Sequence, residues 1–210
     1  MEDLQLEVTK KLVEINTIKI SPESPFTWAS GWKSPIYCDN RKVLSYPAVR
    51  TFIAKQFAAL VREKYPNAEV IAGVATGAIA HGVLVAEELG LPFVYVRSKP
   101  KDHGLENLIE GDLNPGQKVV IIEDLVSTGV SSLKAAEAVR NFGGDVLGMM
   151  AIFTYNFTIA TENFEEANIE LTTLSKYQNL LELALSNGDI TEEQKVDLDG
   201  WRKDPANWGR

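Results

Sequence analysis

Residues 118–131 read KVVIIEDLVSTGVS. Four consecutive apolar, β-branched side chains predict a buried strand over 118–122, because a strand covered on both faces needs no polar alternation. Two acids follow, and then a small, hydroxyl-rich turn leads into a helical pattern over 131–142. A strand that passes through a polar turn into a helix is the basic unit of α/β folds.

The same rhythm recurs on both sides of this stretch. Apolar runs predict further strands near 69–75, 92–97 and 145–153, and a helical pattern occupies 79–89. We therefore expect an α/β fold with a doubly wound, mainly parallel sheet flanked by helices. Ligands of such sheets bind outside the carboxyl ends of the strands, so function is expected just after each strand.

The flanking segments predict less regular structure. Helices are expected over 2–16 and 47–64, a hairpin or short strands over 26–37, and one or two helices over 177–210. Residues 98–116 lack an apolar period, which is typical of a functional lid. At 210 residues we expect a single domain, with an N-terminal part roughly 1–45, a core roughly 46–175 and a helical tail 176–210.

Composition excludes several classes of protein. The net charge of −8 argues against a protein that wraps nucleic acid. Cys38 is the only cysteine, so the chain has no internal disulfide and no cysteine-rich zinc site. The N-terminus is acidic and amphipathic, unlike a signal peptide, and no apolar stretch is long enough to cross a bilayer. We expect a cytoplasmic protein without a membrane partner.

The two acids and the turn have separate chemical uses. Carboxylates at Glu123 and Asp124 can accept hydrogen bonds from two vicinal sugar hydroxyls, and backbone N–H groups at a helix start suit a phosphate. The alternative is that the acids only end the strand and Ser131 only caps the helix. Two acids directly after four apolar residues are a costly way to end a strand, which favours a ligand site.

Two other loops carry candidate residues. Residues 73–82, GVATGAIAHG, include Thr76 and Gly77, whose small size lets a ligand approach the backbone, although a closely packed turn explains them equally well. Residues 95–104, YVRSKPKDHG, concentrate cations and a histidine at the start of the expected lid. A solvated charge run is the alternative there. Neither a Walker A loop nor a dinucleotide-binding fingerprint is present.

The 118–131 stretch resembles the signature of the type I phosphoribosyltransferases, which use 5-phosphoribosyl 1-pyrophosphate (PRPP). The resemblance implies that the acids hold the ribose, that the turn binds its 5-phosphate and that Thr76 and Gly77 receive the pyrophosphate. It also implies a Mg²⁺ ion bound through the substrate, with Glu123 and Asp124 as the candidate protein ligands. The PRPP-binding residues it implies are Arg97, Lys101, His103, Glu123, Asp124, Leu125, Val126, Ser127, Thr128, Gly129, Val130 and Ser131.

The 95–104 loop resembles the catalytic loop of the family's orotate-specific members, and residues 26–41 resemble their hood over the base. This implies transfer of ribose 5-phosphate from PRPP to orotate, on the pathway to UMP. Lys101, His103 and Asp124 would be catalytic and Ser127 would contact orotate. The resemblance also implies a homodimer in which the lid of one subunit completes the active site of the other.

The chain departs from the family pattern at a few positions. Some members have lysine in place of Ser98, and many have lysine in place of Ala29 and glycine in place of Val130. The arginine that some members place after the 145–153 strand is also absent. Three rival functions remain: a purine phosphoribosyltransferase, a PRPP-sensing regulator that contacts RNA, and a sugar-phosphate binding protein. The 97–104 pattern argues against the first and the acidic charge against the second.

Overall fold

The computed structural model describes residues 2–28, 31–99 and 108–208. Its centre is a six-stranded sheet in the order β10-β9-β8-β5-β6-β7. Five strands are parallel, and β7 pairs antiparallel with β6 at one edge. The strands are β5 (Val70–Val74), β6 (Phe93–Val96), β7 (Ile109–Glu110), β8 (Lys118–Val126), β9 (Asp145–Thr154) and β10 (Leu171–Lys176).

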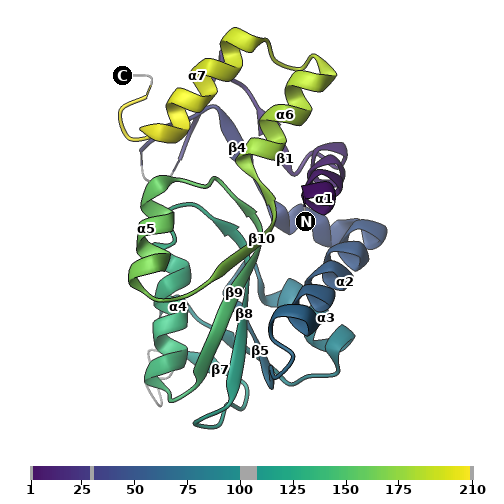
Figure 1. Ribbon diagram of the computed structural model, residues 1–210, viewed down its shortest axis with the longest axis vertical. Coiled ribbons are helices and arrows are strands. Elements are labelled where there is room, and N and C mark those ends of the chain that lie inside the picture. Colours follow the sequence, from purple (N-terminus) through teal and green to yellow (C-terminus); the bar gives the residue numbers. More distant parts are fainter. Residues whose placement is uncertain (1, 29–30, 100–107, 209–210) are drawn as a thin grey trace.

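Helices cover both faces of this sheet (Figure 1). Side chains of β8 alternate between two cores: Val120 and Ile122 pack with helices α2 (Pro47–Lys64) and α3 (Ile79–Leu89). Val119 and Ile121 pack with α4 (Val130–Asn141) and α5 (Thr158–Glu166). The doubly wound α/β prediction is confirmed. The chain reverses its direction of winding between β5 and β8, which is where open α/β sheets bind their ligands.

Strand β8 is longer than the sequence indicated. We expected it to end at Ile122, but it continues to Val126, so both acids lie within the strand. The cause is β9, which keeps pairing as far as Val126 with Thr154, whereas β5 pairs with β8 only as far as Ile122. The last four residues of β8 therefore have a strand neighbour on one side only.

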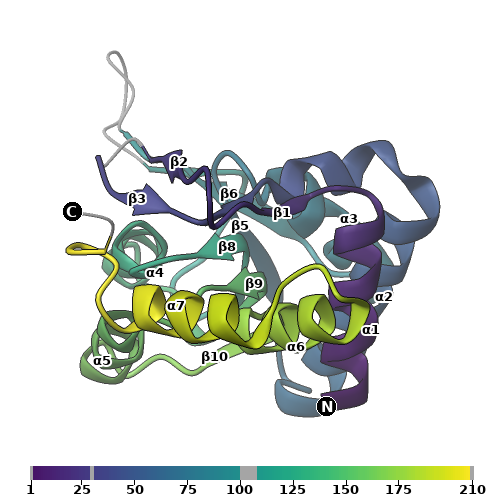
Figure 2. The ribbon, with the colours of Figure 1, turned by 90° about the horizontal axis from the view of Figure 1, so that it is seen from above.

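Smaller elements cover the carboxyl end of the sheet (Figure 2). Strand β1 (Ile18–Ile20) pairs antiparallel with β4 (Ile36–Cys38), and β2 (Phe26–Thr27) with β3 (Lys33–Ser34). The remaining elements are α1 (Glu2–Glu14), the 3-10 helix η1 (Asn40–Ser45), α6 (Tyr177–Asn187) and α7 (Glu192–Lys203). The expected hairpin near 26–37 and the helical tail are therefore present.

The tail, to which the sequence assigned no role, packs against the N-terminal strands. Trp201 of α7 is fully buried, and its indole Nε1 donates a hydrogen bond to the backbone oxygen of Lys33 at 3.0 Å. Its ring lies in an aromatic cluster with centroid distances of 5.2 to 5.9 Å, whose other members are Trp28, Tyr155, Phe157 and Tyr177. Helix α7 thus helps to hold the small strands above the sheet.

Trp201→Ala is expected to lower the free energy of unfolding by about 3–5 kcal/mol, because it opens a large cavity between α7 and the N-terminal strands. Urea unfolding followed by circular dichroism measures the change. Trp201→Phe, which keeps most of the apolar volume, serves as the matched variant and should lose clearly less. Equal losses for the two variants would contradict this account, since the cavity and not the indole hydrogen bond should dominate.

Several elements escaped sequence prediction. Strands β1, β7 and β10 and helix α5 are short, and β10, which reads LTTLSK, has no regular alternation of polar and apolar residues. Helix α2 begins and ends at the predicted residues, because its apolar period is long and Pro47 marks its first turn. No helix within the described ranges is long and apolar enough to cross a membrane.

Candidate active site

The turn after β5 makes a close contact with residues 123–126 of β8, which extend beyond the pairing with β5. A methyl group on Gly77 would overlap the carboxylate of Asp124, so the 75–78 turn packs its backbone directly against this acid. The peptide bond between Ala75 and Thr76 in this turn is cis. The sequence placed Gly77 and Asp124 in different loops, and the fold brings them together at the switch point between β5 and β8.

Glu123 differs from Asp124 in its surroundings. Its carboxylate is buried, with Oε2 accepting a hydrogen bond from the Ser132 hydroxyl at 2.8 Å and Oε1 accepting one from the backbone N–H of Asp124 at 2.9 Å. Both oxygens are therefore already engaged within the protein. Asp124 is half-buried and is the acid with freedom to meet a ligand.

Burial, and then the neighbouring Asp124 carboxylate, raise the pKa of Glu123 from its ordinary 4.5 to about 8. Between these two pH values the folded protein holds a proton that the unfolded chain releases. The native state then binds more protons, so the Glu123 contribution to the free energy of unfolding falls as pH rises from about 4.5 to about 8. Below 4.5 both states are protonated and the contribution is constant.

Glu123→Gln is therefore expected to flatten this pH dependence. Without substrate or metal, wild type should lose more stability than the variant between pH 5.5 and pH 8.5, and urea unfolding at both values measures the difference. Titrating groups that do not interact with Glu123 are common to the two proteins and cancel, so the difference reports Glu123 together with the neighbouring Asp124. Parallel stability profiles would show that Glu123 does not hold its proton in the folded protein.

The turn after β8 packs closely against helix α5 and leads into helix α4. Gly129 has a φ of 81°, and a Cβ there would lie 2.8 Å from the Phe164 ring, so only glycine fits. Asn163 of α5 donates to the backbone oxygen of Thr128 at 2.9 Å and braces the turn. Helix α4 has no side-chain cap at its start, which leaves backbone N–H groups near Val130 and Ser131 available to an anion.

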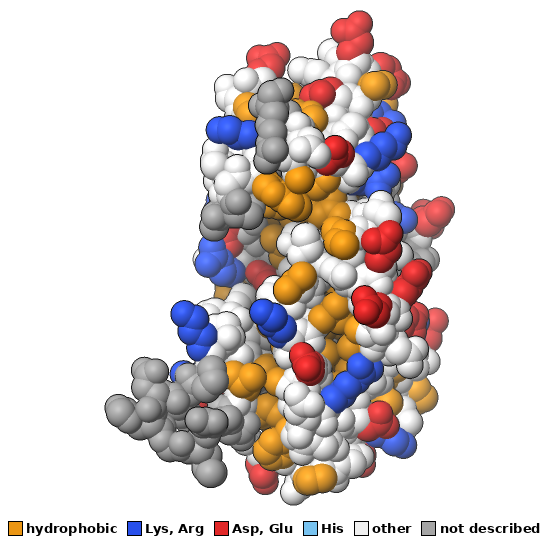
Figure 3. Space-filling model, turned by 90° about the vertical axis from the view of Figure 1, so that its left-hand side faces the viewer, with side chains coloured by type: hydrophobic (Ala, Val, Ile, Leu, Met, Phe, Trp, Pro, Cys, Tyr) orange, Lys and Arg blue, Asp and Glu red, His pale blue; other side chains and the backbone are white. Residues whose placement is uncertain are grey.

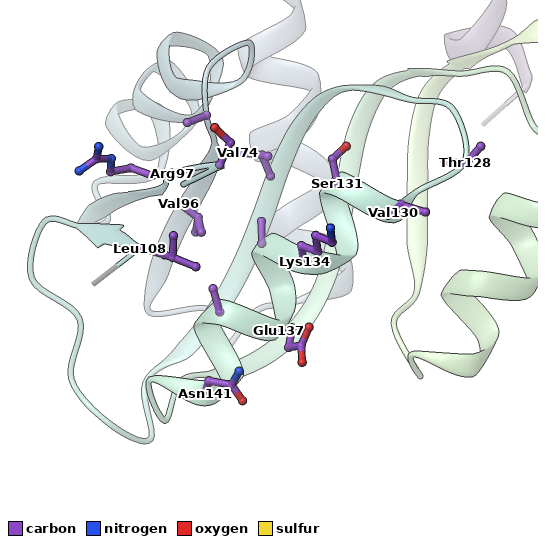
Figure 4. A pocket seen from close by; sticks show the side chains of 14 residues that line it. Val74, Val96, Arg97, Leu108, Thr128, Val130, Ser131, Lys134, Glu137 and Asn141 are labelled. Atoms are coloured by element: carbon purple, nitrogen blue, oxygen red, sulfur yellow. The ribbon is translucent and has the colours of Figure 1, made fainter. Parts of the chain in front are cut away.

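A cavity of about 670 Å³ opens beside this turn (Figure 4). It lies between the ends of β5 and β6 and the exposed side of α4. Residues that line it include Ala75, Arg97, Thr128, Val130, Ser131 and Lys134. Figure 3 shows a recess on one face of the molecule in which acidic side chains are set back and basic side chains lie near the rim.

Leu125 and Val126 have different surroundings from the other predicted PRPP-binding residues. Val126 is fully buried in the core beneath α4 and α5, and Leu125 packs against the core on the other face. Their side chains support the strand, so only their backbone atoms remain for a ligand. Ser127, Thr128 and Ser131 keep at least partly exposed side chains.

Arg97 lies at the rim of the cavity. Its Nη1 atom lies 3.3 Å from Oε1 of Glu110 on β7, and its backbone N–H donates to Leu108 at 2.7 Å. In Figure 4 the guanidinium extends away from Ser131 and Lys134. Ser98 follows it and is exposed. Lys101 and His103 lie outside the described residues.

Sequence reasoning gave no individual role to four polar residues that the fold brings to the site, although Asn40 and His81 lie within the segments 26–41 and 73–82 that it singled out. Ser132 binds Glu123, Lys134 lines the cavity, Asn40 donates to the backbone oxygen of Asp124 at 2.6 Å, and His81 contacts Asn40. Ser132 and Lys134 follow Ser131 within one helical turn, so the helical period could have found them. The bond from Asn40 to Asp124 joins residues 84 positions apart, and no local signal reveals it.

Among the described residues, no group of three or more histidine, cysteine or acidic side chains could hold a metal ion. Because both oxygens of Glu123 are engaged, the site lacks a preformed protein cage. This arrangement fits a Mg²⁺ ion that keeps water and substrate oxygens as its main ligands, which is the usual behaviour of this cation beside phosphates.

The model of the phosphoribosyl transferase domain matches residues 42–164. The chain belongs to the phosphoribosyltransferase family. Its full-length relatives place it in the orotate branch: it is 60% identical over 208 residues to the orotate phosphoribosyltransferase of Phocaeicola vulgatus, covering 99% of this chain and 98% of that one. The orotate phosphoribosyltransferase of Porphyromonas gingivalis is 58% identical over 209 residues, and both chains are covered completely.

Solved structures give the same result for the fold. The structure of Leishmania donovani UMP synthase superimposes with a TM-score of 0.78 at 28% identity and covers 94% of this chain. This chain spans 42% of that longer protein. The resemblance stated from the 118–131 and 95–104 motifs is therefore confirmed for the family and its orotate branch.

Proposed function

We propose that this protein transfers ribose 5-phosphate from PRPP to N1 of orotate, forming orotidine 5′-monophosphate and pyrophosphate in pyrimidine biosynthesis. The observation that carries the proposal is the contact of the Asp124 carboxylate with Gly77. The 127–129 turn connects the end of β8, which bears this acid, to the uncapped start of α4. An acceptor for ribose hydroxyls, a backbone cradle for pyrophosphate and a site for the 5-phosphate then lie side by side.

The chemical difficulty is the separation of charge. Pyrophosphate leaves with a large negative charge while the ribose ring becomes cationic, so the protein must stabilise opposite charges a few ångströms apart. Asp124 accepts hydrogen bonds from the ribose hydroxyls and places negative charge near the ring. Backbone N–H groups at the start of α4, with Thr128 and Ser131, hold the 5-phosphate and fix the position of the sugar.

Cations act at the leaving-group end. Lys101 and His103 belong to the proposed lid, and Arg97 stands where that lid begins. The lid cannot include the whole of 98–116, because β7 pairs with β6 and Ile109 and Leu113 are buried at the sheet edge. Closure of the lid would bring positive charge to the departing pyrophosphate and exclude water, which would otherwise hydrolyse PRPP. Mg²⁺ bound to the substrate would supply further positive charge at the same end.

The N-terminal hood, roughly residues 1–45, is proposed to form the part of the site that binds orotate, with the C-terminal tail packed behind it. Ser127 connects the phosphate turn to this side, because the preceding residue, Val126, accepts a hydrogen bond from the backbone N–H of Tyr155 at 3.2 Å. The centroid of the Tyr155 ring lies 5.0 Å from that of Trp28, a residue of the hood. This placement supports Ser127 as an orotate contact.

The direct test follows the absorbance of orotate when the purified protein meets orotate, PRPP and Mg²⁺. Loss of orotate that requires both PRPP and the metal supports the proposal, and adenine, hypoxanthine, xanthine and uracil serve as competing substrates. Consumption of a purine instead would overturn the assignment of the base. Binding of PRPP without consumption of any base would indicate the PRPP-sensing regulator.

The lid is proposed to act across a homodimer, and a mixing experiment tests this. Lys101→Ala and Asp124→Ala subunits should each be nearly inactive alone. If each active site combines the lid of one subunit with the acids of the other, random exchange yields dimers with one intact site, and up to about a quarter of the wild-type activity per subunit returns. No recovery after verified subunit exchange would show that lid and acids act within one chain.

A further inference from the structure

A buried polar cluster connects the N-terminal strands to the proposed ribose acid. Asn40, at the start of η1, is fully buried, and its Nδ2 atom donates to the backbone oxygen of Asp124 at 2.6 Å. Its own backbone oxygen accepts from Nε2 of His81 on α3, at 3.3 Å. The Cys38 thiol lies 3.5 Å from its Oδ1 atom and donates to it. Asp124 and Cys38 therefore contact the amide side chain of Asn40, and His81 contacts its backbone.

The cluster also determines how the Asn40 amide is oriented. The backbone oxygen of Asp124 only accepts hydrogen bonds, so Asn40 must present its Nδ2 atom there and its Oδ1 atom to Cys38. His81 is buried and must carry its proton on Nε2, because the oxygen it faces is a carbonyl. Burial lowers the pKa of His81, which keeps the imidazole neutral. Each polar group has one defined partner.

The Asn40 side chain supplies a hydrogen bond to β8 at a point where β8 has no neighbouring strand on the β5 side. Pairing between β5 and β8 ends at Ile122, so the backbone of Asp124 has no strand neighbour on that side. An unpaired backbone group in a buried position costs free energy and leaves the local chain free to change direction. The Asn40 amide supplies the missing partner. The direction of the Asp124 side chain, which packs on Gly77, depends on that backbone.

We propose that Asn40 is a positioning residue that acts through the backbone oxygen of Asp124 to aim the carboxylate at the ribose, with His81 holding Asn40 in place. The inference rests on the proposed function, because it takes Asp124 as the acid that meets the sugar. It also links the base-side strands to the ribose acid, since Asn40 begins η1 two residues after the end of β4.

Asn40→Asp tests the inference, because it keeps the shape of the side chain but replaces the donor with an acceptor. We expect kcat to fall by about 10- to 100-fold, because a small misplacement of a reacting group has this effect, while KM for PRPP and for orotate changes by less than about threefold. Wild-type kinetic constants for all three parameters would overturn the inference.

A second pair of variants covers the case in which Asn40→Asp does not fold. His81→Gln keeps an N–H donor at about the distance of Nε2, whereas His81→Leu removes it. We expect kcat close to that of wild type for the first and a reduced kcat with nearly unchanged KM values for the second. Equal kcat values for the two His81 variants would overturn the inference.

A control separates positioning from simple loss of stability. Thr9 of α1 is also fully buried, and its hydroxyl bonds Ser175 at 2.7 Å on the edge strand β10, away from the acids. Thr9→Val should lower the unfolding temperature while kcat remains unchanged. If Thr9→Val lowered kcat as much as the Asn40 variant, positioning would be excluded. If wild type consumed no orotate, the proposed function would fail instead, so the two failures are distinguishable.

Discussion

Replacing Gly77 by alanine is expected to lower kcat/KM for PRPP by about 10²-fold or more, since a displacement of about 1 Å at a reacting group has an effect of this size. The added methyl would occupy the space of the Asp124 carboxylate. Either the 75–78 turn or the acid must then move, and both are proposed to touch the substrate. The loss should therefore appear in PRPP binding as well as in turnover.

Steady-state kinetics and calorimetric titration with PRPP and Mg²⁺ measure the two parts of this effect. Gly200→Ala is a matched control, because nothing lies within 4 Å of a Cβ at that position in α7. That variant should keep wild-type activity and equal or greater stability, since alanine favours a helix. A Gly77→Ala protein with wild-type kcat/KM would show that the close contact has no role in the reaction.

Asp124→Asn is expected to lower kcat by about 10³-fold, because it removes negative charge from the place where the ribose ring becomes cationic. The substitution preserves the size of the side chain, and the backbone oxygen still accepts from Asn40. We therefore expect the folded structure to persist. KM for PRPP should change much less than kcat, since the charge matters most in the transition state.

The matched control is Asp145→Asn, which makes the same chemical change at the exposed amino end of β9, the opposite end of the sheet. It should leave kcat and both KM values unchanged. If Asp124→Asn kept more than about a tenth of the wild-type kcat, the proposed electrostatic role of this acid would be wrong. The ribose hydroxyls would then have to be held chiefly by other groups.

Prediction of the site from sequence succeeded where the signal was local. Residues 118–131 contain a strand, two acids, a turn and a helix start in direct succession, so their order along the chain is also their order in space. The predicted end of β8 was wrong because only β9 pairs with its last residues. The length of a neighbouring strand cannot be predicted from the sequence of β8 itself.

Glu123 and Asp124 show more clearly what could not be predicted from the sequence. They are adjacent in sequence and are both acidic, but they differ in burial: one side chain turns inward to Ser132, and the other lies against Gly77. Successive side chains of a strand point to opposite sides, so a separation of roles was foreseeable. Which acid would be buried depended on where α4 and the 75–78 turn were placed by the rest of the fold.

The sequence by itself determined the doubly wound sheet, the position of the phosphate turn and the family, because these depend on periodicity and contiguous motifs. Only the tertiary structure decided that Gly77 meets Asp124, that Asn40 reaches the same acid from 84 residues away, and that Trp201 binds Lys33 from 168 residues away. Such contacts arise when distant segments compete for the same buried space. The outcome of that competition depends on the shapes of all the packed elements together, and no single stretch of sequence contains it.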